Sequence, residues 1–108
     1  MGWLFLAGAI GTEVAGTVAL RALATEFRWG PAIVVGVGYL ASFGLLALAL
    51  RSVNVGPAYA IWSGVGTAGV AVLALLIYGE RINAVGVVGL VLIVAGVGVL
   101  SLSGAVHG

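Results

Sequence analysis

The sequence of 108 residues contains no cysteine and very few charged side chains. Without cysteine, the chain can form neither an internal disulfide nor a thiolate metal site. Only 6% of the residues are charged, whereas an ordinary soluble domain carries about 25%. Four basic and three acidic side chains cannot cover the surface of a soluble bundle in which 63% of residues are hydrophobic. The shortage of charge therefore predicts an integral membrane protein.

Other signatures are missing as well. The formal net charge is +1, so the sequence offers no basic patch that would suit a nucleic acid. It contains no pattern typical of a phosphate-binding loop, a zinc site or a nucleophile triad. We therefore expect a protein that is not an enzyme, binds no metal and needs no cofactor. Its expected environment is the lipid bilayer.

Four apolar runs account for most of the chain. Each is close to the roughly 20 residues that a helix needs to cross a bilayer. None alternates apolar and polar residues with period two, as the strands of a membrane barrel would. The sequence thus predicts an all-α membrane protein with a single domain, 1–108. The expected helices are 2–20, 31–50, 57–78 and 85–102.

The basic residues are distributed unevenly between the connectors. Four spans place both termini on one side of the membrane. The first and third connectors, on the other side, contain Arg21, Arg28 and Arg81, whereas the second contains Arg51. Such a small excess only weakly favours one orientation under the positive-inside rule. We therefore hypothesise dual topology, in which two oppositely inserted copies form an antiparallel homodimer with the inverted symmetry common among transporters.

One carboxylate, Glu13, lies near the middle of the first run. A charge at that depth costs between about 3 and 10 kcal/mol unless it is neutralised or paired. No other apolar run contains a basic residue, so the counter-ion is expected from outside, as a proton or a cationic substrate. Ala9, Ile10, Gly16 and Thr17 share the helix face of Glu13 and are mostly small, which favours close approach of a ligand. The alternative is a structural Glu13 that is hydrogen-bonded to a neighbouring helix.

Aromatic and hydroxyl side chains recur at helical spacing in the next two runs. An acid among aromatic rings suits a lipophilic cation, because each ring face adds attraction of about 0.5 to 2 kcal/mol. The alternatives are plain aromatic packing or, for Tyr59 near a helix start, a position in the interfacial belt. The candidate substrate contacts are Tyr39, Ser42 and Phe43 in the second run and Tyr59, Trp62 and Ser63 in the third.

Closely spaced glycines suggest two further features. Gly64, Val65 and Gly66 would weaken the third helix locally and could form a hinge. Close helix packing is an equally good explanation for these glycines. In the fourth run, Gly89 and Gly96 are separated by two helical turns and lie on one side. That side is expected to be a helix–helix surface, most simply the dimer interface.

Three segments together resemble the small multidrug resistance family over nearly the whole chain. They are EVAGT at 13–17, YLASF at 39–43 and, most specifically, AYAIWSGVG at 58–66. The segment from Gly89 to Gly96 resembles the dimerisation segment in the family's fourth helix. The resemblance implies a dual-topology antiparallel dimer in the bacterial cytoplasmic (inner) membrane that exchanges protons for cationic compounds.

The resemblance also assigns roles to residues. It implies that Glu13 is the shared proton and substrate site. Aromatic contacts to substrate would come from Tyr39, Tyr59 and Trp62, with Ser42 and Ser63 as polar neighbours. The kink would be formed by Gly64, Val65 and Gly66.

Two positions bear on the substrate. The branch of the family that exports guanidinium typically has Trp three residues after the essential Glu and Thr after the later Trp. This chain has Gly16 and Ser63 there, which favours the quaternary-ammonium branch, and the space left by Gly16 is expected to suit bulky substrates. The alternatives are a guanidinium or polyamine exporter and an accessory subunit that pairs with a paralogue.

Overall fold

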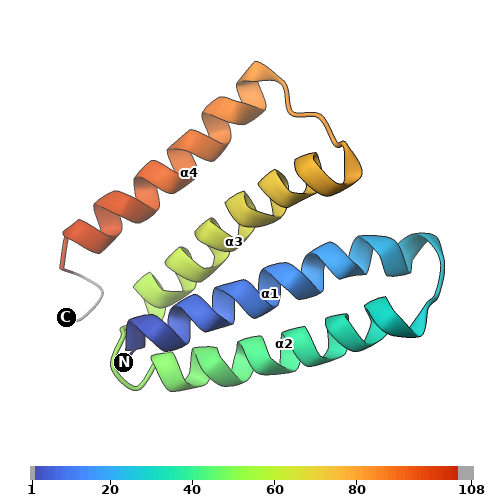
Figure 1. Ribbon diagram of the computed structural model, residues 1–108. Helices are drawn as coiled ribbons and strands as arrows, with labels where there is room; N and C mark the ends of the chain where they lie inside the picture. The colour runs from blue at the N-terminus through green and yellow to red at the C-terminus, as the bar shows by residue number, and fades with distance from the viewer. Residues whose placement is uncertain (1, 105–108) are drawn as a thin grey trace.

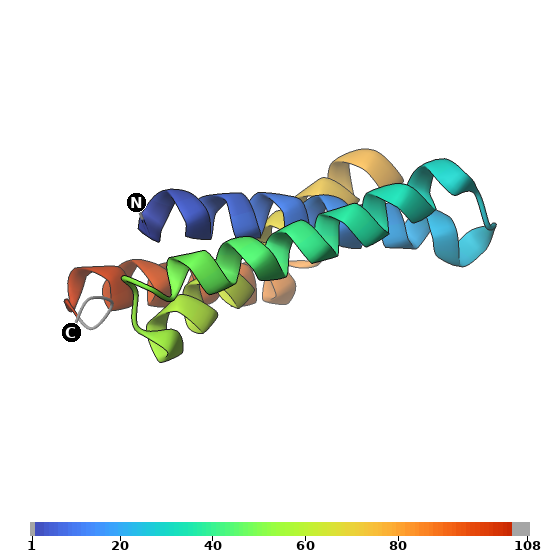
Figure 2. The ribbon, with the colours of Figure 1, turned by 90° about the horizontal axis from the view of Figure 1, so that it is seen from below.

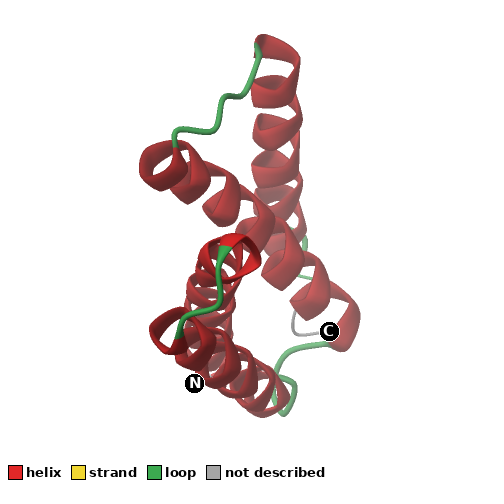
Figure 3. Ribbon diagram, turned by 90° about the vertical axis from the view of Figure 1, so that its right-hand side faces the viewer, coloured by secondary structure: helices red, strands yellow, loops and turns green. Residues whose placement is uncertain are grey.

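The computed structural model describes residues 2–104, which form four helices joined by short connectors (Figures 1 and 3). In chain order these helices are α1 (Gly2–Thr25), α2 (Trp29–Ala49), α3 (Val55–Tyr78) and α4 (Ala84–Leu102). All four are long and apolar enough to cross a membrane. The expected all-helical architecture with four spans is confirmed, and the chain is a multi-pass membrane protein.

Several helix ends differ from the predicted ones. Helix α1 continues to Thr25 instead of ending at Leu20, because the polar connector begins with residues such as Ala22 and Leu23 that favour helix. Helix α2 begins at Trp29, so Pro31 stands in its first turn, where a missing N–H costs nothing. Helix α4 begins after Asn83, whose side chain accepts a hydrogen bond of 2.8 Å from the backbone of Gly86.

Helices α1 and α2 form a close antiparallel pair along almost their full length (Figures 1 and 2). A Cβ atom added to Gly38 would lie 2.8 Å from the backbone oxygen of Thr12 and 3.3 Å from Cα of Gly16. Ser42 is fully buried and donates a hydrogen bond of 2.7 Å to the carbonyl of Ala9. Small residues let two membrane helices approach closely and so increase their van der Waals contact.

The hydrophobic core lies at the end of the molecule where α1 begins and α2 turns into α3. Its buried side chains are Leu6, Ala49, Val53, Ala58 and Ile61. Gly2 is buried there as well. The contact is so close that a Cβ at this position would overlap the side chain of Ser52. This core fixes the start of α3 against α1 and therefore sets where the rest of α3 crosses it.

Helix α4 is packed very differently. It has no buried residue and lies beside α3, apart from the α1–α2 pair (Figure 1). The contact with α3 is close at Gly64, where an added Cβ would lie 2.8 Å from Val97 and 3.3 Å from Ile93. Gly89 and Gly96 have nothing within 4 Å of an added Cβ. One face of α4 is thus open in the protomer.

Candidate functional site

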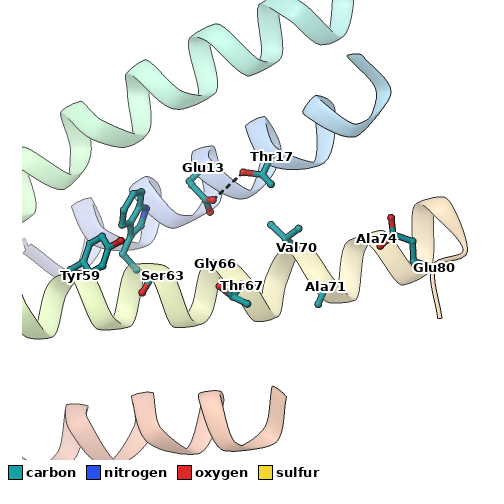
Figure 4. A pocket seen from close by; sticks show the side chains of 11 residues that line it. Glu13, Thr17, Tyr59, Ser63, Gly66, Thr67, Val70, Ala71, Ala74 and Glu80 are labelled. Carbon is teal, nitrogen blue, oxygen red and sulfur yellow. Dashed lines mark hydrogen bonds between the residues drawn. The ribbon is translucent and has the colours of Figure 1, made fainter. Parts of the chain in front are cut away.

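A cavity of about 510 Å³ lies between α1 and α3 and contains Glu13 (Figure 4). Its volume falls in the usual range of small-molecule sites, about 300 to 1,000 Å³. Glu13 points from α1 toward α3, and the hydroxyl of Thr17 points along α1 toward Glu13. The full lining is Glu13, Thr17, Tyr59, Trp62, Ser63, Gly66, Thr67, Val70, Ala71, Ala74 and Glu80. The wall is mostly apolar and aromatic, with carboxylates as its charged groups.

The two carboxylate oxygens of Glu13 have different surroundings. Oε1 accepts a hydrogen bond of 3.0 Å from the hydroxyl of Thr17. Oε2 is buried and has no hydrogen-bond partner among residues 2–104. It lies over Gly66, where an added Cβ would be 2.7 Å away. Because a buried acceptor without a partner is costly, Oε2 marks the place where a proton or a cation would be stabilised most.

A second hydroxyl extends the contact from Glu13 to α2. The Thr17 hydroxyl lies 2.7 Å from the hydroxyl of Tyr39. A hydroxyl has one hydrogen to donate. Since Thr17 donates to Glu13, Tyr39 must donate to Thr17. The two hydroxyls therefore form a chain of hydrogen bonds that runs from α2 to the acid and ends on one oxygen only.

The rings of Tyr59 and Trp62 line one end of the cavity, and Phe43, which is not part of the lining, packs against Trp62. Trp62 has its ring centre 5.5 Å from that of Tyr59 and 5.7 Å from that of Phe43, with interplanar angles of 56° and 62°. The indole Nε1 of Trp62 is buried without a hydrogen-bond partner in the described part of the chain. Tyr59 and Phe43 are exposed on the protomer. Tilted rings beside an acid present the electron-rich faces that attract a cation.

The structure brings together about half of the residues expected at the site. Glu13, Thr17, Tyr59, Trp62 and Ser63 line one cavity, and so does Gly66 from the expected hinge. The continuous helix α3 runs through that hinge segment, where Gly66 faces Glu13 and Gly64 faces α4. Both glycines are thus explained by close contacts, and hinge motion stays a prediction.

The other expected contacts lie outside the cavity of the protomer. Ala9 and Ser42 are buried between α1 and α2, and Ile10 packs against the core. Tyr39 reaches Glu13 only through Thr17.

Gly16 differs from expectation in a specific way. An added Cβ would lie 3.4 Å from two ring carbons of Tyr39. The space that was expected to admit bulky substrates is therefore filled by the Tyr39 ring. The missing side chain at Gly16 instead lets that ring pack on α1 and reach Thr17.

Five lining residues were not expected from the sequence: Thr67, Val70, Ala71, Ala74 and Glu80. Thr67, Val70 and Ala74 follow Ser63 at spacings of three and four, so extending the helical face of Ser63 would have found them. Glu80 lies in the connector after α3, and no periodic signal points to it. Among residues 2–104, no three His, Cys, Asp or Glu side chains come together in a way that could hold a metal ion.

Comparison with known proteins identifies the family. Residues 1–93 match the family described as Small Multidrug Resistance protein. The chain belongs to this family. It is 46% identical over 101 residues to the quaternary ammonium compound-resistance protein QacE of Escherichia coli, covering 94% of this chain and 92% of QacE.

Two further relatives come from other bacteria. Multidrug resistance protein EbrB of Bacillus subtilis is 43% identical over 104 residues, covering 96% of this chain and 89% of EbrB. Multidrug transporter PA4990 of Pseudomonas aeruginosa is 41% identical over 100 residues, covering 93% and 91%. The resemblance seen in the three sequence segments is confirmed. So is the expectation that the chain is not an enzyme, because the small multidrug resistance proteins are transporters.

Proposed function

We propose that this protein exports lipophilic quaternary ammonium cations in exchange for protons, with the proton and the cation competing for Glu13. The observation that carries the proposal is the buried Oε2 atom, which faces a cavity and has no hydrogen-bond partner among residues 2–104. An intramembrane acid is stable only when it is protonated or paired. A positive group that arrives from outside can supply that pairing.

The rest of the cavity favours an organic cation over a metal ion. Tyr59 and Trp62 present ring faces, and Val70, Ala71 and Ala74 add apolar surface. Such a lining favours a cation whose charge is covered by hydrocarbon, because little hydration must be lost on binding. The names of QacE and EbrB refer to quaternary ammonium compounds and to multidrug resistance. These names and the chemistry of the cavity support the same substrate class.

Exchange needs no second site under this proposal. The cation binds when Glu13 is ionised and leaves when a proton takes its place. The hydrogen bond from Thr17 holds Oε1 in place, so the competition takes place at Oε2. The driving force for export is then the inward proton gradient across the bacterial cytoplasmic membrane.

We propose further that the working unit is an antiparallel homodimer. Two features support it. The Gly89–Gly96 side of α4 is open in the protomer, and basic residues stand at both ends of the molecule, with Arg28 and Arg81 at one end and Arg51 at the other. Mapping the orientation of a tag in every copy tests dual topology, and a single fixed orientation would exclude it.

Transport by purified protein in lipid vesicles tests the role of Glu13. Glu13→Gln keeps the shape of the side chain but removes its charge and its ability to take up a proton. We expect it to abolish proton-driven uptake of tetraphenylphosphonium. Glu13→Asp is expected to keep transport with a changed pH dependence. Glu26→Gln is the matched control, because Glu26 is an exposed carboxylate in the first connector. Robust, pH-dependent transport by Glu13→Gln would refute the proposal.

The same vesicles separate the alternatives. A guanidinium or polyamine exporter would give larger transport currents with guanidinium than with tetraphenylphosphonium. An accessory subunit would give no transport when reconstituted alone and would gain it with its paralogue. Transport of tetraphenylphosphonium by this chain alone would exclude the obligatory accessory role.

A further inference from the structure

The end of the cavity farthest from the aromatic rings is formed by Glu80, in the connector after α3 (Figure 4). There α1 and α3 have diverged (Figure 1), and long side chains span the gap between them. Arg21 of α1 forms an ion pair with Glu80. Tyr78, the last residue of α3, also reaches α1. One cavity thus contains two carboxylates, one deep at Glu13 and one at its surface end.

The position of Glu80 is set by the way α3 ends. Gly79 has a φ of 67°, in the left-handed region that favours glycine. This residue turns the chain sharply. The backbone N–H of Glu80 then donates a bond of 3.3 Å to the carbonyl of Ala74, itself a lining residue. The connector is therefore folded back on the helix end, and the Glu80 carboxylate is carried to the cavity.

Tyr78 is fixed independently of the ion pair. Its hydroxyl donates a hydrogen bond of 2.7 Å to the backbone carbonyl of Val18 on α1. The guanidinium carbon of Arg21 lies 5.2 Å from the centre of the Tyr78 ring. Because the bond to Val18 does not involve Arg21, the ring can keep its place when the guanidinium moves away.

Arg21 therefore occupies an environment that would suit a free organic cation. Its guanidinium has a carboxylate on one side and an aromatic ring within cation–π distance. We propose that Glu80 and Tyr78 form an outer cation site at the surface end of the cavity. Arg21 is its built-in occupant, which a hydrophobic cation displaces on its way to Glu13. The inference extends the proposed function, on which it rests, to a second site that receives the same class of cation.

The ion pair is weak enough to be displaced. The side chains of Arg21 and Glu80 are 51% and 47% exposed, and such an exposed pair shifts an equilibrium by only about twofold to fivefold. A displaced Arg21 can extend to the membrane surface and remain hydrated, as arginines near helix ends do. The incoming cation meets the same carboxylate and ring, so it gains the contacts that Arg21 gives up.

Opposite effects of two substitutions test the outer site. Arg21→Gln removes the competitor and is expected to lower the KM for tetraphenylphosphonium by about twofold to fivefold. Glu80→Gln removes the site and is expected to raise the KM, while Glu80→Asp should restore part of the loss. The Arg21→Gln/Glu80→Gln double variant should behave like Glu80→Gln alone. A purely structural ion pair would give the same direction of change for both single variants, and that result would overturn the outer site.

Two controls exclude a general effect of surface charge. Arg81→Gln and Glu26→Gln remove the same charges at the same end of the molecule, from residues outside the cavity lining. Neither should reproduce the change caused by its counterpart. If Arg81→Gln lowers the KM as much as Arg21→Gln does, surface potential explains the effect and the outer site is wrong.

Binding in a Glu13→Gln background separates this inference from the proposed function. The outer site does not contain Glu13, so equilibrium dialysis should detect residual binding of tetraphenylphosphonium to Glu13→Gln protein. Adding Arg21→Gln should strengthen that binding, and adding Glu80→Gln should remove it. If Glu13→Gln still transports, the proposed function fails. If no binding depends on Glu80, the outer site fails.

Discussion

The α1–α2 pair and helix α4 are both strongly apolar, yet the pair is closely packed and α4 is largely exposed. Gly38 and Ser42 are buried where α1 and α2 meet, whereas α4 has the highest mean hydropathy of the four helices and no buried residue. In water, the more apolar helix would be the better buried. In a bilayer, lipid covers apolar surface as well as protein does, so close contact depends on small and hydrogen-bonding residues.

Breaking the close contact should have the largest effect. Gly38→Val would place its Cβ 2.8 Å from the backbone oxygen of Thr12, and backbone cannot move aside cheaply. We expect a loss of about 1 to 3 kcal/mol in stability, measured by thermal or denaturant unfolding in detergent. Gly36→Val is the matched control. Gly36 is on the same helix as Gly38, and an added Cβ there would have no contact within 4 Å. Equal losses for both variants would contradict this account of the α1–α2 contact.

Changing the open face of α4 should leave the protomer intact and affect only its association. We expect the Gly89→Leu/Gly96→Leu double variant to keep its helix content but to weaken self-association about tenfold, or about 1.4 kcal/mol. Sedimentation in detergent and chemical cross-linking in vesicles measure this change. Gly98→Leu is the control, because Gly98 is equally open but lies on another side of α4. A loss of helix content in the double variant would show that this face is covered within the protomer.

The smallest expected effect compares two similar hydrogen bonds. The Ser42 hydroxyl donates to Ala9 across the buried α1–α2 contact, whereas the Ser101 hydroxyl donates to Val97 within exposed α4. Ser42→Ala should therefore cost about 1 kcal/mol, and Ser101→Ala should leave the unfolding curve unchanged. The same detergent unfolding assay measures both. Equal costs would mean that burial between α1 and α2 adds nothing to this hydrogen bond.

The number and kind of the helices could be predicted because they depend on local properties. Apolar runs of bilayer length predict four spans, and Asn83 and Gly79 at helix ends follow ordinary capping rules. The end of α1 was missed because its helix continues beyond the apolar run to Thr25. The apolar run indicates which residues lie in lipid. The end of the helix depends on helix propensity, which stays favourable beyond the apolar run.

The site could be predicted only in part, because periodicity does not say which neighbour a helix face meets. Tyr59, Trp62 and Ser63 were expected beside Glu13 and line its cavity. Ser42 follows Tyr39 by three residues, just as Trp62 follows Tyr59. Ser42 nevertheless faces Ala9 between α1 and α2 and does not line the cavity.

Glu80 illustrates a different limit. Its contact with Arg21 joins residues far apart in the chain, and it depends on the angle at which α3 crosses α1. That angle is held by the core at the opposite end of the molecule and by the bond from Tyr78 to Val18, and both are contacts with α1 that no local sequence pattern predicts.

The two-hydroxyl chain from Tyr39 through Thr17 to Glu13 has a mechanical consequence. It ties the acid to α2 as well as to α1, so a movement of α3 against these two helices would leave both hydrogen bonds intact. Toward α3 the same carboxylate lies over Gly66 and borders the cavity. Helices α1 and α3 are held together by the core at one end and by the hydrogen bond from Tyr78 to Val18 at the other. A change in access to Glu13 that keeps both of these contacts would require α3 to bend between them.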